Sequence, residues 1–144
     1  GTDIVGYYYV NPDGKPSTRD ELVAAEVKGL LSSGSYEVLE KAAKDSQEDE
    51  FRLATTLNFY RKQLKCIGNH EEAKRIARFQ QKSEVQFHIR YLGVGVASIS
   101  QIEDGLIPNY SSDDLMLSTG HEIFLIHGKK LMALAHDLYA RCMR

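Results

Sequence analysis

The stretch from residue 47 to residue 92 constrains this chain more than any other, because a turn signal divides two segments of helical periodicity. Apolar residues before the turn recur every three or four positions, on one side of a helix: Leu53, Leu57, Tyr60, Leu64 and Ile67. Gly68 suits the left-handed conformation that ends a helix, and Asn69 is a favourable N-cap for a second helix. The pattern predicts an antiparallel helix hairpin.

The second arm of this hairpin has two interpretations beyond residue 83. Residues 85–91 alternate apolar and polar side chains, which is the period of a β-strand. Gly93 and Gly95 then disfavour a helix on intrinsic propensity. Either the helix continues to about Leu92, or residues 85–100 form a strand. A strand there has a possible partner at residues 3–10, which are β-branched and aromatic (DIVGYYYV).

Two further helices are predicted from capping boxes, in which a threonine precedes a glutamate by three positions. Thr18 and Glu21 open a helix to about Leu31, and a short helix follows at about residues 36–44. Thr119 and Glu122 open a long C-terminal helix, residues 119–143. Because apolar residues cover more than half of the circumference of this last helix, we expect it to be the most buried element.

These elements predict a mainly α fold. Residues 1–144 form one helix-rich domain, a compact helical bundle built on the central hairpin at 47–92, with an extended arm and turn at 1–16. The alternative is a helix-dominated α+β fold with a small sheet from residues 3–10 and 85–100. The composition, 42% hydrophobic and 26% charged, is typical of a soluble globular domain. No leader and no membrane-spanning run is visible, so we expect a cytoplasmic protein.

The sequence contains no recognisable catalytic motif, and we expect no catalytic residue, no metal site and no cofactor. His121, His127 and His136 are six and nine positions apart, which does not stack two metal ligands on adjacent helical turns. His127 lies on the predicted apolar stripe, which favours a histidine buried in the core. Cys66 and Cys142 are far apart, which favours two reduced thiols in a cytosolic protein. These observations favour a binding domain over an enzyme.

The charge distribution suggests where a partner binds. Residues 1–57 carry a net charge of −5 and residues 58–90 a net charge of +5. Basic side chains of the hairpin and three consecutive tyrosines are the candidate partner-binding residues: Tyr7, Tyr8, Tyr9, Arg61, Lys62, Lys65, Arg75, Arg78 and Lys82.

Two functions follow from these candidates. The first is a non-enzymatic protein–protein interaction or adaptor domain, which docks a protein partner or a second copy of itself. The alternative is a nucleic-acid-associated factor that contacts the phosphate backbone through the basic face of residues 58–90. We expect no membrane partner.

Overall fold

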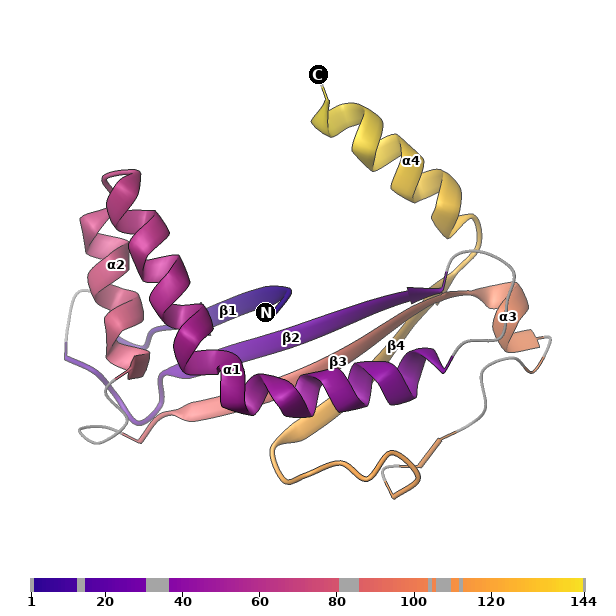
Figure 1. Cartoon of the computed structure of the whole chain (residues 1–144), viewed down its shortest axis with the longest axis horizontal. Coiled ribbons are helices and arrows are strands. Elements are labelled where there is room, and N and C mark those ends of the chain that lie inside the picture. The colour runs from indigo at the N-terminus through magenta and orange to yellow at the C-terminus, as the bar shows by residue number, and fades with distance from the viewer. Residues whose placement is uncertain are drawn as a thin grey trace.

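The computed structural model describes residues 2–12, 15–30, 37–80, 86–103, 105, 110–111 and 113–143. Four strands form one sheet in the order β1-β2-β3-β4 (Figure 1). Their bounds are Ile4–Tyr8 for β1, Glu21–Leu30 for β2, His88–Ser98 for β3 and His121–Gly128 for β4. β1 is antiparallel to β2, whereas β2, β3 and β4 are parallel to one another. The sheet is therefore mixed, and the fold is α+β.

Helices connect the parallel strands, as parallel pairing requires. The helical elements are α1 (Val38–Cys66), α2 (His70–Ala77), the 3-10 turn η1 (Arg78–Gln80), α3 (Ile99–Glu103) and α4 (Leu131–Cys142). α1 crosses one face of the sheet, α2 folds back beside the end of α1, and α4 runs away from the sheet (Figure 1). No helix among these described elements combines the length and the apolar character needed to cross a membrane.

The core lies between α1 and the sheet. Its larger cluster includes Leu22 on β2, Leu57 on α1 and Phe79 on η1, all almost fully buried. The helix approaches β3 closely because β3 carries glycines. A Cβ atom at Gly93 would lie 2.7 Å from the carbonyl oxygen of Ala42, which is shorter than any real contact of this kind. The GVGV stretch thus provides room for α1.

The opposite face of the sheet is apolar and open. Val27, Val94 and Phe124 lie side by side across β2, β3 and β4 in one row of that face. Phe124 is 45% exposed and its neighbour Ile126 is 54% exposed. α4 has no buried residue within the described part of the chain. Because both faces of a parallel sheet are normally covered, this face and α4 are unusual.

The prediction of a mainly α helical bundle built on a helix hairpin is wrong, because the structure is organised by the sheet. The helix predicted from Thr18 to Leu31 is strand β2, up to its last described residue. The helix predicted at 119–143 is divided into β4 and a shorter α4, and it is exposed rather than the most buried element. In both places pairing with neighbouring strands overrides local helix propensity.

The hairpin region itself is corrected in part. The helices expected at about 36–44 and from residue 47 are one continuous helix, α1. Gly68, with φ +81°, ends that helix, and Asn69 caps α2 through its side chain, as predicted. Residues 88–98 are strand and not helix, but they pair with β2 and β4 rather than with the N-terminal strand that the alternative assumed.

Candidate functional site

A cluster of carboxylates lies between β2 and α1, and β2 supplies its first two members. Glu26 and Lys28 are two positions apart on a strand, so both side chains point to the face that α1 covers. The Lys28 ammonium lies 3.1 Å from Glu26 Oε2 and 2.7 Å from Asp45 Oδ2 on α1. Burial alone would lower the pKa of Lys28, but its hydrogen bonds to Asp45 and Glu26 raise it above its usual value. Lys28 is therefore firmly cationic.

Asp49 follows Asp45 by one helical turn, so the same side of α1 presents it to the cluster. Its side chain is 0% exposed, and neither carboxylate oxygen has a hydrogen-bond partner within the described residues. Burial raises the pKa of Asp49, and the charge of Asp3 adds to this, whereas the Thr2 hydroxyl and Arg52 act in the opposite direction. Asp49 is thus a buried acid whose surroundings only partly offset the effect of burial on its pKa.

Asp3 closes the cluster from the N-terminal side. Its Oδ2 accepts a hydrogen bond of 2.9 Å from the backbone N–H of Val27, which places the carboxyl group beside β2. Burial raises the pKa of Glu26, and the neighbouring Asp49 and Asp3 raise it further, against the effect of Lys28. Glu26 therefore links Asp3 and Asp49 to Lys28, which also binds Asp45; we call these five residues the carboxylate cluster.

The cluster has the chemistry of a site for a hard divalent cation. Oxygen ligands from carboxylates suit Mg²⁺, Mn²⁺ and Ca²⁺. No three metal-ligating side chains of the described residues are already arranged around one position. A Mg²⁺ site needs fewer protein ligands than three, because Mg²⁺ binds through one or two carboxylates and completes its shell with water and substrate phosphate. Glu26 and Asp49 are the buried acids that could hold such an ion.

A buried histidine lies near the cluster on β4. His121 stacks on Tyr91 of β3 with ring centroids 4.9 Å apart, and neither ring nitrogen has a hydrogen-bond partner within the described residues. Burial raises the pKa of Tyr91 to about 12, and the charges of Glu50 and Asp49 contribute. Sequence reasoning placed the core histidine at His127, which is exposed instead.

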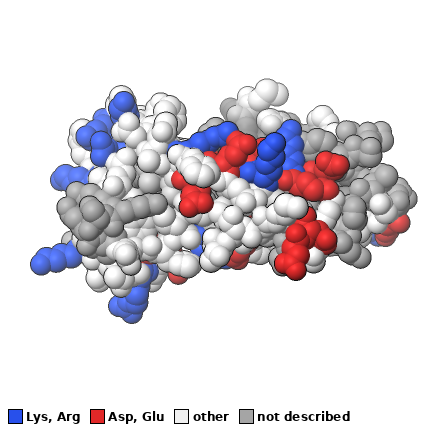
Figure 2. Space-filling view, turned by 60° about the horizontal axis from the view of Figure 1, so that its bottom comes forward, with Lys and Arg blue, Asp and Glu red and all other residues white. Residues whose placement is uncertain are grey.

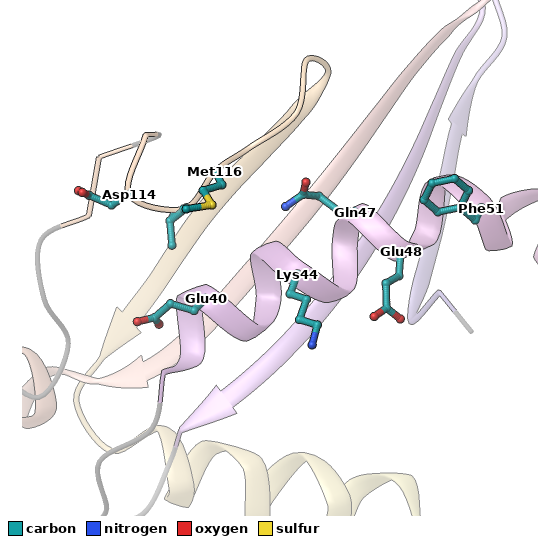
Figure 3. A pocket seen from close by; sticks show the side chains of 8 residues that line it. Glu40, Lys44, Gln47, Glu48, Phe51, Asp114 and Met116 are labelled. Atoms are coloured by element: carbon teal, nitrogen blue, oxygen red, sulfur yellow. The ribbon is translucent and has the colours of Figure 1, made fainter.

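Two cavities flank α1. A cavity of about 380 Å³ is lined by Thr2, Thr55, Thr56, Phe59 and Tyr60. A second cavity, of about 360 Å³, lies between the first half of α1 and residues 114–116 (Figure 3). Figure 3 shows α1 carrying one wall of this second cavity and the segment before β4 carrying the other. Only the first cavity shares a residue, Thr2, with the surroundings of Asp49.

Two of the predicted partner-binding residues hold the N-terminal segment in place. Tyr9 stacks on Phe79 with ring centroids 5.6 Å apart. The Arg78 guanidinium lies 5.0 Å from the centre of the Tyr9 ring and donates hydrogen bonds to the carbonyl oxygens of Asn11 and Pro12. These contacts fix the chain after β1 against η1, so both residues have a structural role.

The other two tyrosines point to opposite faces of the sheet. Tyr7 joins the aromatic group beneath α2, with its ring centre 5.0 Å from that of Tyr9. Burial and a hydrogen bond to Glu72 raise the pKa of Tyr7 to about 12. Tyr8 pairs with Glu21 of β2 on the open face and is 62% exposed. The structure thus does not assemble the three tyrosines into one contact surface.

The predicted basic face is also only partly available. Arg61 donates to Gln80 Oε1 at 2.6 Å, and Arg75 pairs with Glu72 at 3.1 Å. Both arginines are therefore engaged inside the molecule.

Lys62 and Lys65 are exposed at the end of α1, while Lys82 lies outside the described residues. Figure 2 shows Lys and Arg gathered at the end of the molecule where α1 meets α2, and acidic and basic side chains interleaved towards its middle.

The sequence analysis missed every member of the carboxylate cluster. One signal could have located it, namely a glutamate and a lysine two positions apart, which share a face only on a strand. Asp45 and Asp49, four positions apart on a helix, provide the matching signal on α1.

Comparison with known proteins gives one result. A family model described as HamA matches residues 1–142, which is nearly the whole chain. No curated protein and no solved structure matches the chain.

Proposed function

The chain belongs to the HamA family, and we propose that it hydrolyses phosphodiester bonds of nucleic acid with a divalent cation held by the carboxylate cluster. The observation that carries this proposal is Asp49, which is fully buried near the buried Glu26 and has no hydrogen bond to its carboxylate oxygens within the described residues. An active site, unlike a structural core, accounts for two buried acids placed against each other.

A bound cation explains the energetics of the cluster. An ionised carboxylate buried without a partner costs several kcal/mol, and two adjacent ones repel each other. Lys28 supplies a single positive charge and is shared by Glu26 and Asp45. A divalent cation offsets the remaining negative charge. The incomplete arrangement of protein ligands leaves positions on the ion for water and for a phosphate oxygen.

Three members of the cluster then have a role in hydrolysis. Glu26 and Asp49 would hold the cation, which would supply an activated water molecule and a positive charge beside the phosphoryl oxygen. Lys28 stabilises the negative charge that develops on the phosphoryl group. The water oxygen forms a new bond to phosphorus as the bond to the leaving oxygen breaks. One proton of the water ends on the leaving oxygen and the other remains with the phosphate product.

The surface charge favours nucleic acid over a small phosphate ester. Lys62 and Lys65 are exposed on α1, the helix that also carries Asp49. Exposed basic side chains on the helix that carries Asp49 suit a polyanionic backbone. This proposal keeps the basic hairpin of the sequence analysis as a binding surface, but reduces it to fewer residues and adds a reaction.

The test is cleavage of mixed-sequence single-stranded and double-stranded DNA and RNA in Mg²⁺ or Mn²⁺, with chelator as the blank. We expect cation-dependent cleavage by the wild type, reduced by at least about 100-fold in Lys28→Met and in Asp49→Asn. Lys44→Met is the matched control, because Lys44 is an exposed lysine on α1 outside the cluster. Absence of cleavage by the wild type on all four substrates refutes the proposal.

A second candidate function, self-association, is favoured by the open sheet face and α4. The helix has 12 residues and is about 18 Å long. Four strands span about 19 Å, so one such helix fits across the sheet. Because one chain carries both an uncovered apolar helix and an uncovered apolar face, two copies can each cover the other symmetrically. We infer that a second copy of the chain occupies this face.

The oligomeric state tests this inference. We expect a dimer by analytical ultracentrifugation, with a monomer produced by Leu138→Glu on α4 and by Phe124→Glu on β4, both of which are exposed. Phe51→Glu is the control, because Phe51 is an exposed aromatic residue on the far side of α1. A wild type that stays monomeric at about 100 μM contradicts the inference, since an interface of standard size binds more tightly.

We also propose a cytoplasmic location, supported by the cysteines. Cys66 and Cys142 are both exposed and unbonded, which suits a reducing compartment. Rapid alkylation of intact cells should label both thiols; a protein in which either is already oxidised contradicts this location.

A further inference from the structure

The cavity of about 380 Å³ beside α1 opens next to the carboxylate cluster and has the character of a ligand site. Pockets that bind small molecules usually measure about 300–1,000 Å³ and combine apolar walls with a few polar groups. Here two aromatic residues, Phe59 and Tyr60, form the apolar part, and Thr2, Thr55 and Thr56 supply hydroxyl groups. The proposed reaction at the cluster makes no use of this cavity.

Thr2 connects the cavity to the cluster. Its hydroxyl lies 3.4 Å from that of Thr56 in the cavity wall. The same hydroxyl interacts with Asp49 and lowers the pKa of that carboxyl group, against the effect of burial. Thr2 and Asp3 are also consecutive, so one segment of chain contributes to both places. The cavity and the cluster therefore meet at the segment of Thr2 and Asp3.

Phe59 gives the cavity a stacking surface. It is 57% exposed, although it lies on a long helix that packs most of its other large apolar side chains. Tyr60 supports it edge-on, with ring centroids 5.8 Å apart and planes at 71°. Exposed aromatic rings beside basic side chains are the usual platform for nucleobases. Lys62 is exposed one turn further along the same helix face.

We propose that this cavity binds one unpaired nucleobase of the substrate, next to the phosphodiester bond that is cleaved, by stacking on Phe59. This inference rests on the proposed function. The threonine hydroxyls contact the polar edge of the base. Since a hydroxyl both donates and accepts a hydrogen bond, all four bases are accommodated and sequence preference is weak. Because a paired base must first leave its stack, single-stranded or frayed substrates are cleaved in preference to intact duplex.

The first test separates binding from chemistry. Phe59→Ala should raise the KM for a single-stranded oligonucleotide about tenfold or more, since stacking on one aromatic residue contributes that much per base. Its kcat should stay close to that of the wild type, because Phe59 contacts no reacting group. Phe59→Trp should restore the KM. Phe51→Ala is the matched control, an exposed phenylalanine on the same helix that lines the other cavity.

The second test uses the substrate. Once the cleavage position is mapped, an abasic residue is placed on each side of it in turn. At one of the two positions the wild type should lose as much affinity as Phe59→Ala does, and the variant should lose nothing further. If the wild type cleaves nucleic acid but Phe59→Ala leaves KM unchanged, or if the two losses add, the base site is refuted while the proposed function stands. If the wild type cleaves nothing, the proposed function itself fails.

Discussion

Replacing Asp49 with asparagine should make the protein more stable and inactive at the same time. Asp49 is fully buried, and its oxygens have no hydrogen-bond partner within the described residues. The substitution removes a buried charge and relieves its repulsion with Glu26. We expect a gain of about 1–2 kcal/mol in the free energy of unfolding without cation, typical of stabilising changes at functional sites.

The gain is smaller than the several kcal/mol that an unpaired buried ion costs, for two reasons. The raised pKa of Asp49 already reduces the fraction that is ionised. The asparagine amide also has to be satisfied in the same closed space. For a domain of this size, each 1 kcal/mol shifts the melting temperature by about 2–4 °C.

Added divalent cation should make the wild type more stable than Asp49→Asn, which reverses their order without cation. The wild type gains about 2.7 kcal/mol when free Mg²⁺ or Mn²⁺ reaches about 100 times its dissociation constant, whereas Asp49→Asn gains little. Differential scanning fluorimetry with and without cation measures both effects. Glu50→Gln is the matched control, because it makes the same change at the adjacent, exposed position and should stay within about 0.5 kcal/mol of the wild type.

Two results would refute this reasoning. If Asp49→Asn is less stable than the wild type without cation, then the carboxylate has partners that compensate its burial. If the variant gains as much stability from cation as the wild type does, then the ion binds elsewhere. A variant that is stabilised yet still cleaves nucleic acid at the wild-type rate would leave the structural part intact and remove Asp49 from the reaction.

Three further predictions concern the fold. Gly93→Ala should destabilise the protein by about 1–3 kcal/mol, because its Cβ meets the Ala42 carbonyl oxygen; unchanged urea unfolding would show that α1 shifts freely. Phe79→Ala should cost about 3–5 kcal/mol by emptying the main core cluster, and a loss below 1 kcal/mol in the same assay would contradict the packing. Above pH 10 the free energy of unfolding should fall, because tyrosine ionises near 10 in the unfolded chain but Tyr91 ionises at about 12 in the folded one. Tyr91→Phe should reduce that slope, and an equal slope in both proteins would contradict the assignment.

The local turn could be predicted from the sequence, whereas the sheet could not. The stop at Gly68 and the cap at Asn69 depend on backbone groups within a few residues, and sequence reports them directly. The sequence of β2 (ELVAAEVKGL) predicts a helix, because Leu, Ala, Glu and Lys all favour helices and because a capping box precedes it. A central strand in a largely parallel sheet shows no clean alternation, which removes the signal that identifies a strand.

The prediction for β4 was wrong for a related reason. The sequence of β4 is a short apolar run (HEIFLIHG), and only two lysines separate it from α4. The two elements together therefore resemble one apolar helix. Periodicity cannot separate a buried strand from a buried helix over eight residues. The prediction that the last helix is buried failed for the same reason. Part of the apolar surface expected on that helix belongs to strand β4, and α4 itself is exposed.

The error in β2 is also the reason why the functional site was missed. In a helix, Glu26 and Lys28 would be about 200° apart around the axis and could not act together. On a strand they point the same way, towards Asp45 and Asp49. The conversion of one segment from helix to strand therefore brings five charged residues into one cluster, in which four acids share a single lysine. Any chain with Glu-x-Lys in a possible central strand, followed by acids at i and i+4 on a helix, merits the same inspection for a cation site.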